Sequence, residues 1–366
     1  MSNLREAKCP NCDAPMRYDP ERDKLVCDFC HTEMDIQPEE EDLSQPAQQG
    51  EASLEGFHFE QYAKQAQKPD AEALPIYNCP SCGAELITPK EAAALTCPYC
   101  RNNIVMTNQV SGSLRPDGIL PFRITAKMLP AAMQQYYKDK ILLPRNFFSD
   151  STMGNITGVY VPFWLFSGTI SGSLNYRARR SAAVRQGDYI VTTTSHYDLN
   201  RDVSMAFENL PVDASGRIDD ALMDSLEPFD MSDLRPFDMN YMAGFTADRF
   251  DKTAEDIASK AESRMKQTAY SVANTAASAG YEGAVRTGGS LQAVMSQVRY
   301  VLLPVYLFQV SHAGKNYSFA VNGQSGKIMG EIPTDKGVQF RHFLKYSLPA
   351  VGLILLASVV SYLMGR

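Results

Sequence analysis

All eight cysteines of the chain fall into two copies of one spacing pattern. Each copy has two C-x2-C pairs separated by 14 residues, and the second copy lies 70 residues after the first. A C-x2-C turn directs two thiolates at one point, and a β-hairpin between the pairs would complete a tetrahedral S4 site. The pattern therefore predicts two structural zinc sites. Their expected ligands are Cys9, Cys12, Cys27 and Cys30 in the first ribbon, and Cys79, Cys82, Cys97 and Cys100 in the second.

Four sulfur ligands indicate a structural role. Because they leave no open coordination position for water, a catalytic role for the zinc is disfavoured. Iron in a rubredoxin-like site is the alternative metal for the same four ligands. Gly83 supplies the positive φ that such a turn favours. His31 follows a complete quartet, and we expect it to be a surface residue. Each ribbon is too small to fold on core burial alone, so metal binding would supply roughly 10–16 kcal/mol of folding free energy.

The C-terminal end predicts a membrane anchor. Residues 347–364 read SLPAVGLILLASVVSYLM and carry no charge. As a helix they would span about 27 Å, close to the roughly 30 Å of hydrocarbon in a bilayer; a buried core helix is the alternative. Pro349 falls in the first turn of this expected helix, where its missing N–H is tolerated, and Tyr346 and Tyr362 lie near its ends. Basic residues precede the run, which by the positive-inside rule places its N-terminal side in the cytoplasm.

Charge argues against a protein that coats nucleic acid. The 366-residue chain has a net charge of −7 and a pI near 5.4. Residues 1–35 hold five basic and eight acidic side chains, and residues 76–110 hold two of each, so neither ribbon offers the cluster that phosphate binding requires. The N-terminus lacks the apolar region of a signal peptide. Everything before the anchor is therefore expected in the reducing cytosol, beside the cell membrane, where cysteines bind metal rather than form disulfides.

A polar, acidic linker is expected between the two ribbons. Residues 36–60 contain no Lys or Arg, and Glu39 opens a run of four acidic residues. Phe57, Phe59 and Tyr62 interrupt the linker as an aromatic cluster. The cluster would pack on the second ribbon or bind a partner, and packing is the simpler interpretation.

The rest of the soluble part is typical of a strand-rich α+β domain. Residues 120–124 predict a short strand, and Thr125 would cap a helix that runs to Lys138. The stretches YVPFWLF at 160–166 and LLPVYLF at 302–308 align at an offset of 142 residues, proline with proline. This likeness indicates an internal duplication whose two strands enter one sheet. A proline in mid-strand predicts an edge position or a bulge.

Further strands and one long helix complete the domain. Residues 173–208 alternate as antiparallel strands, and residues 317–329 form a hairpin around the turn NGQSG. Residues 240–276 contain a helix that would cross the sheet or pair with another chain. Its expected inward positions are Phe250, Ala254, Ile257, Ala261, Met265, Thr268 and Val272.

The soluble part has one basic concentration, and its arginines are Arg177, Arg179, Arg180, Arg185 and Arg201. A solvated strand face is the simpler interpretation, and an anionic lipid surface or an acidic partner is the functional one. His196, with Asp198 and Asp202 nearby, could be assigned a catalytic role. No activated Ser or Cys, phosphate loop or metalloprotease helix accompanies it, so we expect no enzymatic activity.

The order of these features resembles a known family. Besides the doubled ribbons and the two proline-containing strands, the chain carries MNYMAGFTADRFD at 239–251 and YSFAVNGQSGKIMGEIP at 317–333, before its apolar tail. Along nearly its whole length it is similar to prokaryotic membrane-anchored proteins described as TFIIB-type zinc-ribbon or primosomal protein N′-like. The family's ligand positions map onto the eight cysteines, and no catalytic residues carry over. The helicase label is unsupported, because the chain has no G-x4-GK[ST] loop.

The resemblance also implies a class of partner. Some relatives are encoded beside phage-shock protein A-like proteins and stomatin/prohibitin/flotillin-like (SPFH-domain) proteins. This neighbourhood implies an adaptor that brings such proteins to the membrane.

Together these features predict an α+β chain with two N-terminal zinc ribbons, a strand-rich domain with an internal duplication, and one C-terminal transmembrane helix. We expect a membrane-tethered adaptor or scaffold that recruits cytosolic proteins in membrane-stress or membrane-organisation assemblies. The alternative is a membrane-associated nucleic-acid-binding zinc-ribbon protein, and oligomerisation is left open. The expected boundaries are 1–35 for ribbon 1, 36–75 for the linker, 76–110 for ribbon 2, 111–340 for the α+β domain and 346–364 for the transmembrane helix.

Overall fold

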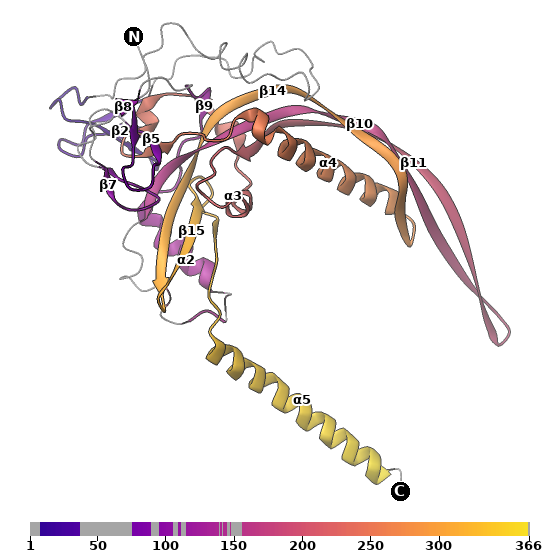
Figure 1. Ribbon diagram of the computed structural model, residues 1–366. Coiled ribbons are helices and arrows are strands. Elements are labelled where there is room, and N and C mark those ends of the chain that lie inside the picture. Colours follow the sequence, from indigo (N-terminus) through magenta and orange to yellow (C-terminus); the bar gives the residue numbers. More distant parts are fainter. Residues whose placement is uncertain are drawn as a thin grey trace.

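The computed structural model shows an α+β body from which a long curved arm and a single helix extend (Figure 1). It describes residues 8–36, 75–88, 95–104, 109–110, 115–138, 140, 142–144, 147 and 156–364. Most of the expected linker, with its aromatic cluster at Phe57, Phe59 and Tyr62, lies outside this part. The α+β class, two four-cysteine clusters near the N-terminus and an apolar C-terminal helix confirm the prediction. The internal duplication stays a prediction.

Three long antiparallel strands form the arm: β10 (Thr157–Gln186), β11 (Tyr189–Asp213) and β14 (Gly283–His312). β10 lies between the other two, so that Phe163 faces Asp213 on β11 and Val301 on β14. Near the body its side chains are buried, whereas toward Gln186 they become exposed. The strands expected in 173–208 are therefore confirmed, and the two proline-containing stretches pair in one sheet as predicted.

The two mid-strand prolines lie neither in an outer strand nor at a bulge. Pro162 faces Leu302, and Pro304 faces Tyr160. On the edge of β10 that faces away from β14, the paired strand is β13 (Thr246–Asp248) before Pro162 and β11 after it. On the edge of β14 that faces away from β10, the paired strand is β9 (Gly118–Ile119) before Pro304 and β15 (Lys315–Asn322) after it. Each proline is tolerated because no adjacent strand requires an N–H donor at that point.

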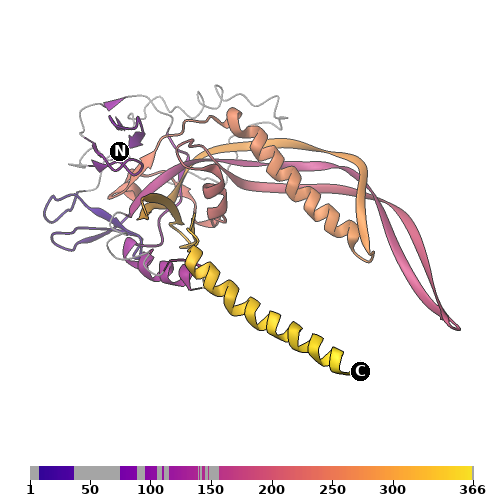
Figure 2. The ribbon, with the colours of Figure 1, turned by 60° about the horizontal axis from the view of Figure 1, so that its bottom comes forward.

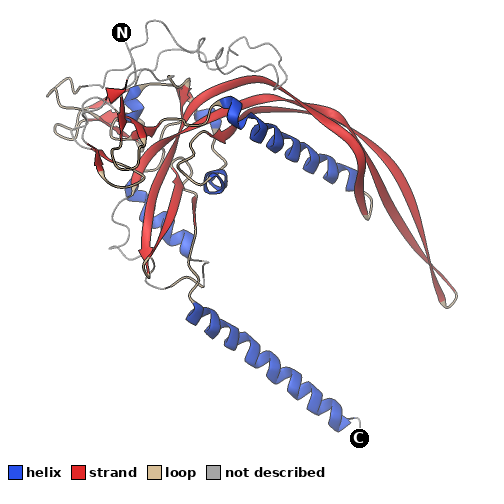
Figure 3. Ribbon diagram, viewed as in Figure 1, coloured by secondary structure: helices blue, strands red, loops and turns tan. Residues whose placement is uncertain are grey.

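Helix α4 (Ala254–Ser278) lies along the concave side of the arm (Figure 3). It begins at a capping box between Thr253 and Asp256, so the helix expected within residues 240–276 is confirmed, although Phe250, expected among its inward positions, precedes it. A 3-10 turn (Met239–Met242) and β13 lie before the helix. Its buried positions are Ala254, Ile257, Ala258, Ala261, Met265, Ala269, Ala273 and Ala277. Because this stripe is mostly alanine, the helix packs closely on the strands. Thr268 and Val272, expected to face inward, are exposed.

The start of the α+β domain differs from the prediction. The strand expected at 120–124 ends earlier, at Ile119, because Pro121 has no N–H to continue the pairing. The helix begins as a 3-10 turn (Ala126–Met128) and continues as α2 (Leu129–Tyr137). Thr125 occupies the N-cap position as predicted, but its side chain makes no capping hydrogen bond. Its hydroxyl instead donates to Glu21 of ribbon 1 at 3.0 Å.

The hairpin expected at 317–329 is confirmed by β15 and β16 (Ile328–Gly330). At its turn the buried Asn322 side chain accepts hydrogen bonds from the Gln324 and Ser325 amides. The same side chain donates to the carbonyls of Leu226 and Pro228, which ties the turn to α3 (Asp220–Leu226). The body also contains a 3-10 turn (Met231–Asp233) and β12 (Arg235–Pro236), which pairs with β9.

Helix α5 (Lys336–Met364) leaves the body on the same side as the arm (Figures 1 and 2). It begins before the expected residue 346, because the Asp335 carboxylate accepts hydrogen bonds from the Gly337 and Val338 amides as a helix cap. Pro349 therefore lies inside the helix rather than in its first turn. The helix is long and apolar enough to cross a membrane, and its apolar window is not buried against the rest of the chain.

We expect Ala269→Leu to destabilise the arm. Ala269 is fully buried against the strands, and added methylene groups in such a contact typically cost about 1–3 kcal/mol. The matched variant Val272→Ala, at an exposed position of the same helix, should change stability by less than about 0.5 kcal/mol. Thermal unfolding in detergent, followed by circular dichroism, compares the two variants. Equal destabilisation by both would contradict the observed helix face.

Candidate metal centres

Two groups of four cysteines converge in the described part of the chain. Within each group the four Sγ atoms lie within 4.8 Å of one another. The spacing pattern therefore brings together the residues that it predicted, namely Cys9, Cys12, Cys27 and Cys30 in ribbon 1, and Cys79, Cys82, Cys97 and Cys100 in ribbon 2. Each group is able to hold one metal ion.

The sulfur geometry fits a tetrahedral ion. Metal–sulfur bonds of about 2.3 Å place the sulfurs of a tetrahedral site about 3.8 Å apart. The Sγ atoms of Cys9 and Cys30 are 3.3 Å apart, and those of Cys82 and Cys97 are 3.6 Å apart. A hydrogen bond with the Thr32 hydroxyl, and then one from the Thr32 amide, lowers the pKa of the Cys30 thiol to about 6. This environment favours the thiolate form of Cys30, which is the form that binds metal. At Cys12 a hydrogen bond from the Ala14 amide lowers the pKa, but hydrogen bonds with the Cys27 and Cys30 thiols outweigh it and raise the pKa.

Each C-x2-C turn is followed directly by a residue with positive φ. These residues are Asp13 (57°), His31 (59°), Gly83 (71°) and Arg101 (63°). The role predicted for Gly83 is confirmed, and three other residue types adopt the same conformation at the equivalent positions. His31 is exposed and lies outside the sulfur cluster, as expected.

Ribbon 1 is fixed to the body through its hairpin. Its strands are β1 (Arg17–Asp19), β2 (Lys24–Val26) and β3 (Glu33–Asp35), and the β1–β2 pair confirms the hairpin expected between the cysteine turns. Tyr18 is fully buried and packs edge-on against Tyr241 of the body, with the two ring centroids 5.4 Å apart. Its hydroxyl donates to Asp23, which in turn pairs with Arg235 of the body at 2.6 Å.

Ribbon 2 is continuous with the main sheet. Its strands are β4 (Ile76–Asn78), β5 (Glu85–Ile87), β6 (Leu95–Thr96), β7 (Asn103–Ile104) and β8 (Gln109–Val110). β5 pairs with β4 on one side and with the body strand β13 on the other, whereas β6 pairs with β7. The hairpin expected between the two cysteine turns is therefore absent from the described residues here, because β13 occupies the second edge of β5.

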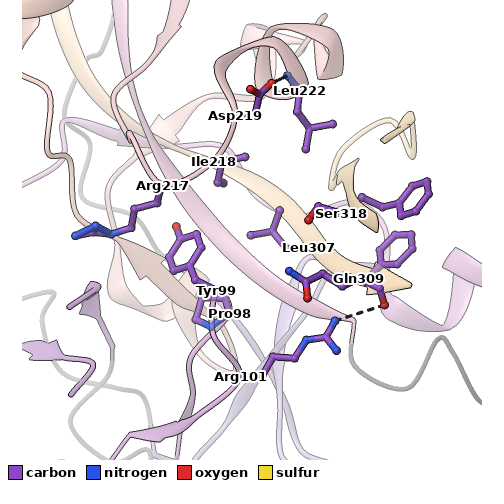
Figure 4. A pocket seen from close by; sticks show the side chains of 12 residues that line it. Pro98, Tyr99, Arg101, Arg217, Ile218, Asp219, Leu222, Leu307, Gln309 and Ser318 are labelled. Carbon is purple, nitrogen blue, oxygen red and sulfur yellow. Dashed lines mark hydrogen bonds between the residues drawn. The ribbon is translucent and has the colours of Figure 1, made fainter. Parts of the chain in front are cut away.

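The second cysteine turn of ribbon 2 docks on the body through Tyr99. Its hydroxyl donates to Asp248 Oδ2 at 2.7 Å, and Arg101 Nη2 donates to the Gln309 carbonyl at 3.5 Å. Figure 4 shows Tyr99 and Arg101 opposite Leu307 and Gln309 of β14, around a cavity of about 210 Å³. This side of ribbon 2 is therefore an internal contact of the protein.

Two buried carboxyl groups lie at this contact. Asp248 is fully buried and also accepts a hydrogen bond from the Ser215 hydroxyl, while Arg217 lies 3.5 Å from its other oxygen. Burial raises the pKa of Asp248 to about 6, and the hydrogen bonds from Tyr99 and Ser215 oppose the shift. Asp213 accepts a bond from the Ser215 amide, but its Oδ2 has no hydrogen-bond partner among the described residues. Burial raises the pKa of Asp213 to about 7.

The two ribbons use one repeated position in opposite ways. Phe29 and Tyr99 both occupy the third position of the second C-x2-C turn, 70 residues apart. Tyr99 is docked on the body, whereas Phe29 is 75% exposed. Sequence reasoning missed this contrast. The available signal was the tyrosine hydroxyl, which can bond to a buried carboxylate where phenylalanine cannot.

The other residues considered from the sequence do not form a site. His196, Asp198 and Asp202 are exposed along β11, and Asp198 pairs with Arg177 at 3.4 Å. In the part of the chain that the structure describes, the groups of potential metal ligands are the two cysteine clusters alone.

Comparison with known proteins gives a full-length relative. The chain is 31% identical over 358 residues to the uncharacterized protein YdjG of Bacillus subtilis (strain 168), and the alignment covers 98% of each chain. No family model matches the chain, and no solved structure matches it.

We expect Cys12→Ser and Cys82→Ser each to remove one bound metal ion per chain, measured by elemental mass spectrometry. The two cysteines are exposed and occupy equivalent positions of the repeat. Cys82→Ser should lower the thermal unfolding midpoint of the body further, because ribbon 2 pairs with β13 and carries the Tyr99 contact. Equal decreases in the unfolding midpoint for the two variants would contradict the stronger attachment of ribbon 2 to the body.

We expect Asp213→Asn to stabilise the protein more at about pH 8 than at about pH 5. The folded-state pKa of Asp213 is raised to about 7, above the value near 4 of an unfolded aspartate. Its contribution to stability is therefore present below about pH 4 and lost as the pH rises toward 7. The amide does not ionise, so the variant should gain on the order of a few kcal/mol on the alkaline side. A pH-independent difference in thermal midpoint would contradict the buried, ionising carboxyl.

Proposed function

This chain belongs to the same family as YdjG, and we propose that it is a membrane-anchored zinc-ribbon adaptor. In this proposal α5 spans the cytoplasmic membrane, the residues before it lie in the cytoplasm, and each cysteine cluster holds a structural zinc ion. Ribbon 1 binds a cytosolic protein and recruits it to the membrane. The role is binding rather than catalysis, in assemblies that respond to membrane stress or organise the membrane.

The ligand chemistry supports structural zinc. All four donors of each cluster are sulfur, and a filled tetrahedral S4 shell leaves no position for a substrate or a reactive water. Such an ion serves to fold the ribbon and to hold its turns in place. Iron is the alternative for the same ligands, and the elemental analysis described above distinguishes the two.

The charges around α5 support the cytoplasmic location of the body. Arg341, His342 and Lys345 lie on the side toward the body, and Arg366 follows the apolar run. Basic residues concentrate on the cytoplasmic side of membrane helices. Cytosolic thiols also stay reduced, which keeps the cysteines available for metal.

The observation that carries the adaptor proposal is the exposed turn of ribbon 1. The equivalent turn of ribbon 2 is used within the protein, where its aromatic side chain docks on the body. Ribbon 1 presents Phe29 on the same rigid frame, 75% exposed, while its hairpin side is held by Tyr18. A fixed, exposed aromatic ring loses little conformational freedom on binding, which makes it an effective anchor at an interface.

The surroundings of Phe29 define the chemistry of the partner. Asp28, which precedes Phe29 in the chain, is exposed and pairs with Arg17 at 3.4 Å, and Asp13 is exposed directly after the first cysteine turn. A partner would therefore offer an apolar pocket for Phe29 with basic groups at its rim. The same acidic side chains disfavour nucleic acid as the ligand of ribbon 1. The resemblance to proteins encoded beside SPFH-domain and phage-shock protein A-like proteins makes these classes the first candidates.

We expect Phe29→Asp to release the cytosolic partners while leaving the protein in the membrane with its metal. Loss of an aromatic anchor from an interface commonly costs more than 2 kcal/mol, so capture should fall by about 30-fold or more. The measurement is quantitative mass spectrometry after a mild-detergent pull-down of the full chain from its own membranes. The matched control is Met128→Asp, which makes the same type of change at an exposed apolar residue of the body.

Each outcome decides between binding classes. Unchanged capture by Phe29→Asp, with the metal content intact, would overturn the role of ribbon 1. Recovery of replication or transcription proteins whose association is sensitive to nuclease and to salt would favour the nucleic-acid-binding alternative.

A further inference from the structure

The outer end of the arm is a two-stranded hairpin that no other described element covers. β14 begins at Gly283, opposite Arg179 of β10. Beyond this level β10 and β11 continue as a pair, from Arg180 opposite Ser195 to Gln186 opposite Tyr189. We call residues 180–195 the hairpin tip. Figure 1 shows it projecting past the end of α4.

The hairpin tip exposes apolar side chains on both of its faces. Val184 lies opposite Val191 on one face, and the adjacent Ile190 lies on the other face because neighbouring residues of a strand alternate. The exposed fractions are 60% for Val184, 78% for Tyr189 and 74% for Ile190. A lone two-stranded hairpin is at best marginally stable in water. These side chains therefore favour an environment that surrounds the tip with apolar groups.

Positive charge accompanies this apolar end. Residues 177–201 hold five arginines and two aspartates, in a chain whose net charge is −7. Of the aspartates, Asp188 lies in the turn and Asp198 pairs with Arg177. Arg185 is exposed at the tip, where its side chain donates to the Gly187 carbonyl of the turn. At the base, Arg180 donates to the Gly280 carbonyl. Apolar groups at the end and arginines around them complement acyl chains below anionic headgroups.

The arm extends toward the side of the molecule where α5 lies. Both ribbon views show α5 and the hairpin tip on one side of the body, with the two ribbons at the other end (Figures 1 and 2). A membrane crossed by α5 would therefore lie on the side of the body toward which the arm extends.

We propose that the hairpin tip is a second membrane contact, which places Val184, Tyr189 and Ile190 in the interfacial layer of an anionic bilayer and Arg185 among the lipid phosphates. This inference rests on the proposed anchoring by α5. A lipid layer surrounds the tip and so covers both of its apolar faces, whereas a second copy of the chain packed on one face would leave the other exposed. Tyrosine and arginine both suit this layer, because each has an apolar stem and a polar end.

The contact would orient the body. With α5 and the tip both held by one bilayer, the arm cannot swing freely about the connector before α5. The two ribbons then face away from the membrane, and the exposed Phe29 of ribbon 1 is available to a cytosolic partner.

A fluorescent side chain at the tip tests the proposal in the full-length protein. Tyr189→Trp adds a reporter to a chain whose single tryptophan, Trp164, is fully buried and hydrogen-bonded to the Lys252 carbonyl. The variant is placed in nanodiscs of neutral or phosphatidylglycerol-containing lipid, with and without brominated acyl chains. We expect the emission of the introduced indole to shift to shorter wavelength and to be quenched by brominated lipid, more strongly on the anionic discs.

Charge reversal at the tip supplies the specific control. Adding Arg185→Glu to Tyr189→Trp should abolish the preference for anionic discs, whereas Lys127→Glu, at an exposed position before α2, should leave it intact. Emission that stays solvent-like on anionic discs, although the chain co-elutes with them, would overturn the proposal. A blue shift that persists in detergent, depends on protein concentration and is insensitive to brominated lipid would overturn it in favour of a second copy. Failure to co-elute would instead overturn the anchoring by α5, and this inference with it.

Discussion

The rest of the structure depends on the pairing of β10 along both of its edges. One edge joins β14, and the other joins first β13 and then β11. Through β13 the strand is connected to ribbon 2, and through β11 and β14 it continues into the arm. Trp164 on β10 is fully buried and donates to the Lys252 carbonyl just before α4, so the same strand positions that helix. One continuous sheet thus relates the second metal cluster to the hairpin tip.

Local signals made much of this fold and both clusters predictable. The C-x2-C spacing determines where four sulfurs converge, whatever surrounds the ribbon. The turns at Gly187 and Asn322 mark their hairpins because short polar and glycine-containing segments separate alternating strands. The uncharged apolar run at the C-terminal end likewise predicts α5 from neighbouring residues alone. In each case a few neighbouring residues carry the information.

The features that sequence reasoning missed depend on contacts between distant residues. Phe250 fits the helical spacing of the residues that follow it, yet it precedes α4 and packs edge-on against Trp164 of β10 and Tyr300 of β14. Hydrophobicity favoured Val272 for the inner face of α4, but the close approach of the strands selects alanines such as Ala269 and Ala273. Thr125 is a good capping residue, and its hydroxyl bonds Glu21 of ribbon 1 instead. None of these choices can be read from neighbouring residues alone.

The repeated ribbons show how one frame can serve two purposes. The ligand spacing is identical in both, so the metal-binding requirement determines where the third residue of the second turn points. What remains variable is that residue and its surroundings. In ribbon 2 the tyrosine meets a buried carboxylate, Asp248, whose burial would be costly without hydrogen-bond donors. In ribbon 1 the phenylalanine has no polar group to satisfy and stays exposed. A rigid turn that holds such a ring outward leaves its apolar surface to be covered by another molecule, because nothing in the described part of the chain covers it.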